Sequence, residues 1–119
     1  MIRGVGVDVV DLARFARALE RTPRLRERLF AESERALPVH SLAAWFAARE
    51  ALIKALGRDA GLGWHDLEIV VDEHGDPAFA RPPALEAALA ARGADRAHVT
   101  MTHDAGVACA FVVLEGGVG

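Results

Sequence analysis

The chain has 119 residues, 52% of them hydrophobic and 26% charged, and carries a formal net charge of −3 at pH 7. This length and composition support one hydrophobic core and exclude a disordered protein. The weak negative charge is not typical of a nucleic-acid-binding protein, and no apolar run approaches the ~20 residues that span a bilayer. We therefore expect one compact domain over residues 1–119 that contacts neither nucleic acid nor membrane.

The first predicted element is a strand over residues 2–10, IRGVGVDVV, which we expect to be buried because apolar β-branched residues dominate it. It lacks the apolar segment and cleavage site of a secretory signal, and the single Cys109 cannot form an internal disulfide. We therefore expect a cytoplasmic protein whose Cys109 is reduced and buried. Asp8 is unusual in this strand, because burying an unpaired carboxylate is costly.

Two helices are predicted next. Asp11 is a good N-cap for a helix over residues 12–20, which must end before Pro23. Thr22 and Pro23 then form a cap and first-turn pair for a short helix over residues 23–30.

The longest predicted helix covers residues 42–56, LAAWFAAREALIKAL. It follows a polar connection over residues 31–40, which has room for one helical turn. Ser41 is the expected N-cap. Gly57 is the expected stop, because the left-handed geometry that ends a helix favours glycine.

The remaining predicted elements are two hairpins and one more helix. Residues 67–72 and 77–80, separated by EHGD, predict the first hairpin, and residues 83–92 predict an amphipathic helix. Residues 97–103 and 106–115, which meet at DAG, predict a final hairpin with long apolar strands. This mixture of elements indicates an α+β fold.

Basic residues are concentrated near the N-terminus. Six of the fourteen are Arg14, Arg17, Arg21, Arg24, Arg26 and Arg28. All but Arg26 are spaced alternately by three and four residues, which predicts a basic stripe along one side of the helical region, bent at Pro23. Such a stripe on an acidic protein indicates an acidic partner, and the alternative is an ordinary solvated face.

Lys54 is the only lysine in the chain and follows Glu50 by four residues in the longest predicted helix. The simplest interpretation is a surface ion pair contributing ~0.3–0.5 kcal/mol. The alternative is a phosphate-handling site, because an ammonium group is a compact charge with a titratable proton, unlike a guanidinium fork.

Five motifs occur in one order along nearly the whole chain: GVGVDVVDLARF, RLFAESE, FAAREALIKALG, HGDP and HVTMTHDAG. This series resembles the bacterial holo-acyl-carrier-protein synthases, which are small 4′-phosphopantetheinyl transferases. The patterns of that family are G-[IV]-G-x-D, R-x-F-[TA]-x-x-E, F-A-x-K-E-A-x-x-K-A-x-G, G-x-P and V-S-[IL]-[ST]-H.

The resemblance implies an enzyme that uses Mg²⁺ to transfer 4′-phosphopantetheine from coenzyme A to a serine of an apo acyl carrier protein, releasing adenosine 3′,5′-bisphosphate. It also implies the phosphopantetheinyl transferase fold, in which an antiparallel sheet packs against a long central helix. The family further implies a homotrimer whose coenzyme A sites are shared between neighbouring subunits. The carrier protein itself could belong to fatty-acid or to polyketide synthesis, which the sequence does not distinguish.

The resemblance also assigns roles to residues. Asp8 and Glu50 would hold Mg²⁺, which prefers hard carboxylate oxygens, and Lys54 would contact the diphosphate and stabilise the departing phosphate. The base that deprotonates the serine is either a metal-bound water oriented by Glu50, or His103 beside Asp104. The implied contacts to coenzyme A are Arg49, Lys54, Gly57 and His103. The implied docking residues for the acidic carrier protein are Arg14, Arg17, Arg21, Arg24 and Arg28. The remaining histidines are expected to be surface or strand-end residues: His40, His65, His74 and His98.

Three features depart from the family pattern. Trp45 stands where the family has an arginine that helps to hold coenzyme A phosphate, Arg49 replaces a lysine, and residues 35–41 are shorter than usual. Arg35 could replace the missing arginine, or the Trp45 indole could stack on adenine. These departures keep two other hypotheses open: a module that docks carrier protein but turns over poorly, and a hydrolase of nucleotide diphosphates. A docking module needs neither coenzyme A nor Mg²⁺, and a hydrolase needs no carrier protein.

Overall fold

The main sheet has three antiparallel strands with the C-terminal strand in the middle. In the computed structural model, which describes residues 1–57 and 61–117, β5 (Val107–Glu115) lies between β1 (Ile2–Asp11) and β4 (Arg96–Asp104). The predicted α+β fold with an antiparallel sheet is confirmed, as is the final hairpin formed by β4 and β5.

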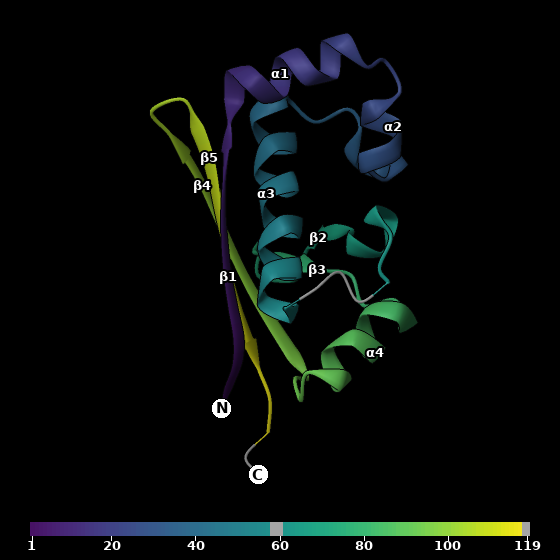
Figure 1. Ribbon diagram of the computed structural model, residues 1–119, viewed down its shortest axis with the longest axis vertical. Coiled ribbons are helices and arrows are strands. Elements are labelled where there is room, and N and C mark those ends of the chain that lie inside the picture. The colour runs from purple at the N-terminus through teal and green to yellow at the C-terminus, as the bar shows by residue number, and fades with distance from the viewer. Residues whose placement is uncertain (58–60, 118–119) are drawn as a thin grey trace.

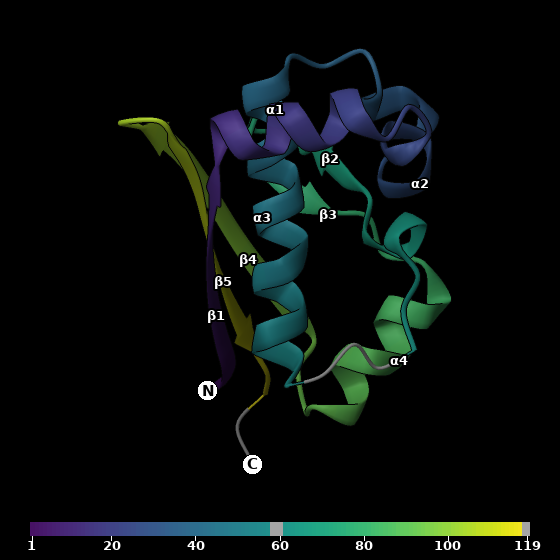
Figure 2. The same ribbon diagram turned by 45° about the horizontal axis from the view of Figure 1, so that its top comes forward.

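Helix α3 (Val39–Leu56) covers one face of this sheet, as Figure 1 shows. Because side chains alternate along a strand, every second residue of β5 packs toward α3 in the core. The opposite face is open to solvent over the described part of the chain (Figure 1 and Figure 2). Its exposed apolar side chains are Val5, Val7, Val9 and Phe111.

The open face corrects two predictions. The first strand is buried on one side only, because Val5, Val7 and Val9 of β1 are each at least half exposed. Cys109 pairs across the sheet with Val9 and is partly exposed rather than buried. Both predictions failed for the same reason. An apolar strand pattern does not reveal whether one or two faces are covered within a single chain.

The long helix α3 begins earlier than its sequence suggests. Its N-cap is Pro38 rather than Ser41, and the Pro38 carbonyl accepts hydrogen bonds from the N–H groups of Ser41 and Leu42 at 3.0 Å each. Proline suits this position because its φ is already fixed near the required value and its missing N–H is not needed. The predicted end is confirmed, since Gly57 has a left-handed φ of 88°.

Helices α1 (Leu12–Arg21) and α2 (Leu25–Leu29) lie at the end of α3 nearest its N-terminus (Figure 1). The Asp11 cap is confirmed, because its carboxylate accepts a hydrogen bond from the Arg14 N–H at 2.8 Å. Thr22 does not begin α2. Its N–H donates to the Ala18 carbonyl and so ends α1.

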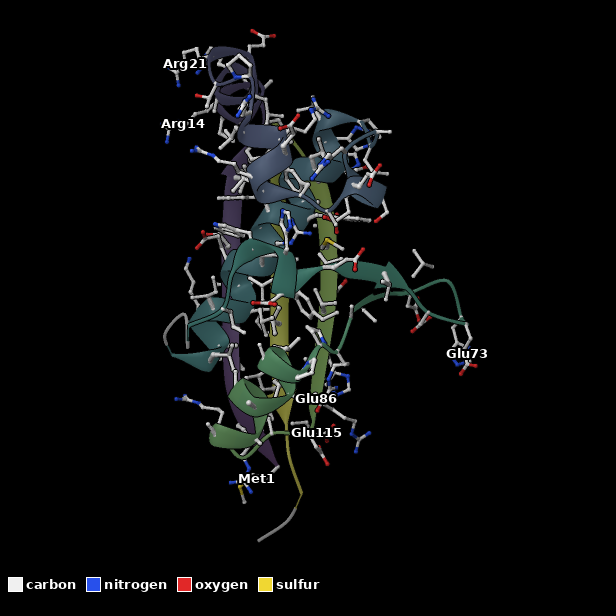
Figure 3. The ribbon with its side chains drawn as sticks, turned by 90° about the vertical axis from the view of Figure 1, so that its right-hand side faces the viewer. Met1, Arg14, Arg21, Glu73, Glu86 and Glu115 are labelled. Atoms are coloured by element: carbon white, nitrogen blue, oxygen red, sulfur yellow. The ribbon has the colours of Figure 1, made fainter. Side chains whose placement is uncertain are left out.

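The second half of the chain closes the core on the other side of α3. Two short 3₁₀ helices, η1 (Glu32–Glu34) before α3 and η2 (Trp64–Leu67) after it, connect the larger elements. The predicted hairpin is confirmed as β2 (Ile69–Val71) and β3 (Pro77–Phe79), and Figure 3 shows it projecting from the body with Glu73 at its tip. Helix α4 (Pro83–Ala91) adds Leu85, Ala88 and Leu89 to the core. Over the described residues, every helix is too short or too polar to cross a membrane.

Candidate active site

Asp8 of β1 and Lys54 of α3 form an ion pair across the strand–helix interface. The Lys54 Nζ lies 2.9 Å from Asp8 Oδ1 and donates a second hydrogen bond, at 3.0 Å, to the Val7 carbonyl. The interpretation of Lys54 as the surface partner of Glu50 is therefore incomplete, because its short contacts reach a different strand. Asp8 is 17% exposed and Lys54 is 54% exposed, so the pair is open to a ligand from solvent.

Two glycines make this close approach of β1 and α3 possible. A Cβ atom on Gly6 would lie 1.9 Å from the Ala51 carbonyl oxygen, and one on Gly4 would lie 2.2 Å from that of Ala55. Both distances are far inside van der Waals contact, so only glycine fits at these positions. The GVG of the first strand is thus a helix-packing surface that brings Asp8 against α3.

Glu50 completes an acidic pair with Asp8. Partial burial raises the pKa of the Glu50 carboxyl, the negative charge of Asp8 raises it further, and Lys54 opposes the shift. Two carboxylates in mutual repulsion beside a single ammonium form a site that favours additional positive charge.

A cavity of about 330 Å³ adjoins this acidic pair. Asp8 and Glu50 line one part of it, and the rings of Phe15 and Phe46, whose centroids are 5.5 Å apart, line another. The remaining lining residues are Val9, Val10, Asp11, Arg14 and Ala18. The cavity therefore combines a charged end with an apolar wall between α1, α3 and β1.

His103 lies at the other edge of the sheet. Asp8 is on edge strand β1 and His103 on edge strand β4, with β5 between them, so strand spacing alone separates the two edges by about 10 Å. A second cavity, of about 170 Å³, lies there between the start of α3 and the end of β4. It is lined by His40, Ser41, Ala44, Trp45, Met101, Thr102 and His103. Within one chain, His103 and Trp45 therefore do not share the cavity of Asp8 and Glu50.

His40 is exposed, as expected from the sequence, but the centroid of its ring lies 4.7 Å from that of His103. The sequence carried no signal for this contact, because the two histidines are far apart in the chain and belong to different elements.

Arg49 is in the core rather than at the surface, with no exposed area. Its guanidinium donates to the carbonyls of Leu29 and Leu67, at 2.7 and 2.8 Å, and forms a buried ion pair with Glu34. Burial lowers the pKa of Arg49, while the hydrogen bond and charge of Glu34 oppose that shift. This geometry disagrees with the prediction that Arg49 contacts coenzyme A. Arg49, which is on α3, instead holds the end of α2, η1 and η2 against that helix.

The predicted docking residues all lie on the surface. Arg14, Arg17 and Arg21 are exposed on α1, and Figure 3 shows Arg14 and Arg21 at one end of the molecule. Arg24 and Arg28, at α2, are exposed as well. In contrast, the Arg26 guanidinium donates to the Arg35 carbonyl, in agreement with its absence from the predicted stripe.

Two further predicted residues can be placed. Arg35, the suggested replacement for the family arginine at position 45, donates to the carbonyls of Phe30 and Glu27, so its guanidinium stabilises a local loop. Gly57 ends α3 three residues after Lys54 and is exposed.

The residues at the acidic pair fit a hard divalent cation. Among residues 1–57 and 61–117, no group of three or more histidine, cysteine, aspartate and glutamate side chains could enclose a metal. Asp8 and Glu50 offer two carboxylates, which is the usual protein contribution to Mg²⁺ when water and phosphate oxygens complete its octahedron.

Comparison with known proteins shows the family of the chain. Residues 4–112 match the model of the 4′-phosphopantetheinyl transferase superfamily. The holo-[acyl-carrier-protein] synthase of Leifsonia xyli subsp. xyli is 65% identical over 97% of this chain and 98% of its own length. Among solved structures, the synthase of Neisseria meningitidis has a TM-score of 0.85 at 32% identity, covering 97% of this chain and 99% of that one. The synthase of Helicobacter pylori, solved in complex with coenzyme A, has a TM-score of 0.80 at 28% identity, covering 93% and 99%. The chain therefore belongs to the 4′-phosphopantetheinyl transferase superfamily, as an enzyme of the holo-[acyl-carrier-protein] synthase type.

Proposed function

We propose that this enzyme transfers 4′-phosphopantetheine from coenzyme A to a serine hydroxyl of an apo acyl carrier protein in a Mg²⁺-dependent reaction that releases adenosine 3′,5′-bisphosphate. The observation that carries the proposal is that Asp8 and Glu50 line one cavity while Lys54 forms an ion pair with Asp8, in a member of this superfamily. Coenzyme A bound to the Helicobacter pylori relative supports the donor.

The acidic pair supports the metal assignment. We assign Asp8 and Glu50 as the protein ligands of Mg²⁺, which when bound supplies charge neutralisation and orientation of the diphosphate oxygens. Burial raises the pKa of the Glu50 carboxyl and the charge of Asp8 raises it further, and a bound cation would offset part of this penalty on the ionised form. Lys54 is then the residue that contacts the diphosphate and protonates or shields the departing phosphate.

The apolar wall of the larger cavity suits the uncharged part of the donor. With the diphosphate at Asp8, Glu50 and Lys54, the amide-linked pantetheine arm can extend along Phe15 and Phe46. This places the aromatic pair where it excludes water from the reacting phosphate.

The serine base remains one of two groups. A water oriented by Glu50 would act at the acidic pair of the same chain, whereas His103 belongs to the opposite edge of the sheet. His103 could therefore act at the acidic pair of one chain only if that His103 belonged to a neighbouring copy. Contacts of the nucleotide with His103 and Trp45 would likewise come from a neighbouring copy.

We propose that copies of the chain form the expected homotrimer through the open face of the main sheet. Its exposed apolar residues, Val5, Val7, Val9 and Phe111, need a cover that the described chain does not supply. An assembly that brings the β4 edge of one copy to the β1 edge of the next would unite the two cavities into one shared site.

Replacing Phe111 with glutamate should break this assembly, because a charge would be buried at the centre of an apolar interface. Light scattering after size-exclusion chromatography should give a trimer mass for the parent and a monomer mass for the variant. Val71→Glu is the matched control, since Val71 is also exposed but lies on the projecting hairpin. A parent that is monomeric, or a Phe111→Glu protein that remains a trimer, contradicts the proposed interface.

Charge reversal at Arg14 and Arg21 should weaken binding of the acidic carrier protein by about tenfold or more, and much more than it weakens coenzyme A binding, because opposite charges steer and hold the partner. The measurement is the KM for each substrate at two salt concentrations. The parent should lose carrier affinity as salt rises, and the double variant should lose much less. Arg14 also lines the larger cavity, so Arg21→Glu alone tests docking without touching it. An equal loss for both substrates would show misfolding or a different docking surface.

The test of the proposed function as a whole is intact-mass spectrometry of an apo acyl carrier protein after incubation with this enzyme, coenzyme A and Mg²⁺. We expect a mass gain of one phosphopantetheine group that disappears when a chelator is added. Bound but unmodified carrier protein would favour the docking module, and release of free phosphopantetheine without carrier protein would favour the hydrolase.

A further inference from the structure

Lys54 and the proposed metal would both bind the carboxylate of Asp8. In this structure the Lys54 ammonium is bonded to Asp8 Oδ1 at 2.9 Å and anchored by the Val7 carbonyl at 3.0 Å. Asp8 is also one of the two groups assigned to Mg²⁺. The ammonium therefore lies where a cation bound to Asp8 would lie, and it does not point at a separate phosphate subsite.

We propose that Lys54 competes with the divalent metal for Asp8, so that metal binding releases the lysine for the diphosphate of coenzyme A. The inference rests on the proposed function, because it takes Asp8 and Glu50 as the metal ligands. It adds that Lys54 weakens metal binding to the free enzyme, although it promotes the reaction once coenzyme A is bound.

The charges of the site give the competition its direction. With both carboxylates ionised, Lys54 leaves one net negative charge at the site. A dication gains more Coulomb energy there than the ammonium it replaces. Lys54 is 54% exposed, so its ion pair with Asp8 is only weakly held and can exchange with an ion from solvent. Once Asp8 is neutralised, the diphosphate is the anion that the freed ammonium can reach.

The same argument accounts for a lysine in a chain whose other basic residues are all arginines. A guanidinium can grip a carboxylate with two parallel hydrogen bonds, whereas an ammonium is a point charge on a flexible stem. Arginine at position 54 would hold Asp8 more firmly and give it up less readily. Lysine can both occupy the site and leave it.

The test is a titration of the full-length protein with Mn²⁺ alone, in which electron paramagnetic resonance measures the free ion. Lys54→Met should bind Mn²⁺ about tenfold more tightly than the parent, because a positive charge beside the metal is removed. Lys54→Arg should bind it no more tightly than the parent. Asp8→Asn should remove the binding in the parent and in the Lys54→Met background.

Arg96→Met is the matched control for net charge. Arg96 is 67% exposed and lies at the far end of the sheet, where its strand pairs with Glu115 rather than with the segment around Asp8. Asp8 lies six residue steps along β1 from Ile2, which is at that end, and this amounts to about 20 Å. This variant should bind Mn²⁺ as the parent does.

The outcomes separate the inference from the proposed function. The competition is wrong if Lys54→Met binds Mn²⁺ no more tightly than the parent. It is also wrong if neither the parent nor Lys54→Met binds Mn²⁺ without coenzyme A. A repeat titration with coenzyme A present then tests the metal assignment by itself. If Mn²⁺ binds the parent under that condition and Asp8→Asn removes the binding, the assignment stands although the competition is wrong. If Mn²⁺ does not bind in either condition, the metal assignment fails as well.

Discussion

Replacing Glu50 with glutamine should reduce phosphopantetheine transfer by about a hundredfold to a thousandfold, the range seen when one electrostatic stabiliser of a transition state is removed. Glutamine keeps the shape of the side chain but leaves Asp8 as the only carboxylate of the acidic pair. The measurement is the initial rate of carrier-protein modification at saturating coenzyme A over a range of Mg²⁺ concentrations. Excess Mg²⁺ should recover only part of the rate.

The same variant should be at least as stable as the parent, which distinguishes a lost ligand from a damaged fold. The pKa of Glu50 is raised in the folded protein, first by burial and then by Asp8. A carboxyl with a raised pKa ionises more easily in the unfolded chain, so its charge destabilises the fold at neutral pH, and this penalty disappears as the pH falls. Thermal unfolding should therefore give Glu50→Gln an equal or higher Tm at neutral pH, and the difference should shrink toward about pH 4.

Full activity of the variant would remove Glu50 from the metal site. Lower stability at neutral pH would contradict the electrostatic argument.

Local signals in the sequence were sufficient for most of the fold. The Asp11 cap, the Gly57 stop and the two hairpins each depend on residues next to one another, and each agrees with the structure. The predicted starts of α2 and α3 are wrong, because Thr22 and Ser41 have side chains suited to capping whereas the helices begin after Arg24 and Pro38. A helix start depends on where the preceding segment approaches, and this is a tertiary effect.

Long-range contacts account for what the sequence did not reveal about the site. Arg49 follows the pattern of a charged helix residue, yet its guanidinium is buried against Glu34 and two carbonyls from distant segments. His40 gave no indication of its contact with His103. The resemblance to a family indicated Asp8, Glu50 and Lys54 without saying what brings them together. That cause is the packing of β1 on α3, which depends on glycine.

Replacing Gly6 with alanine should lower both stability and transfer, although Gly6 touches no substrate in the proposed reaction. The new Cβ would lie 1.9 Å from the Ala51 carbonyl oxygen, which is a backbone atom, so no side-chain rotation can relieve the clash. Overpacking of this kind costs about 1–3 kcal/mol of unfolding free energy. Strand and helix must move apart, which lengthens the contact between Asp8 and Lys54 from its present 2.9 Å. We expect a lower Tm and, well below that temperature, a rate reduced by about tenfold or more, since a displacement of about 1 Å can have a larger effect.

Gly63→Ala is the control that isolates the steric effect. A Cβ at Gly63 would meet its nearest neighbour at 3.6 Å, an ordinary contact, so this variant should keep the parent's Tm and rate. Comparison with Gly4→Ala separates stability from positioning. That Cβ would clash with the Ala55 carbonyl at 2.2 Å, but Gly4 lies two residues further from Asp8 than Gly6 does. If Gly4→Ala and Gly6→Ala lose similar stability but Gly6→Ala loses more of the transfer rate, then Gly6 positions the acidic pair. If rate follows stability equally in both variants, the glycines serve folding alone.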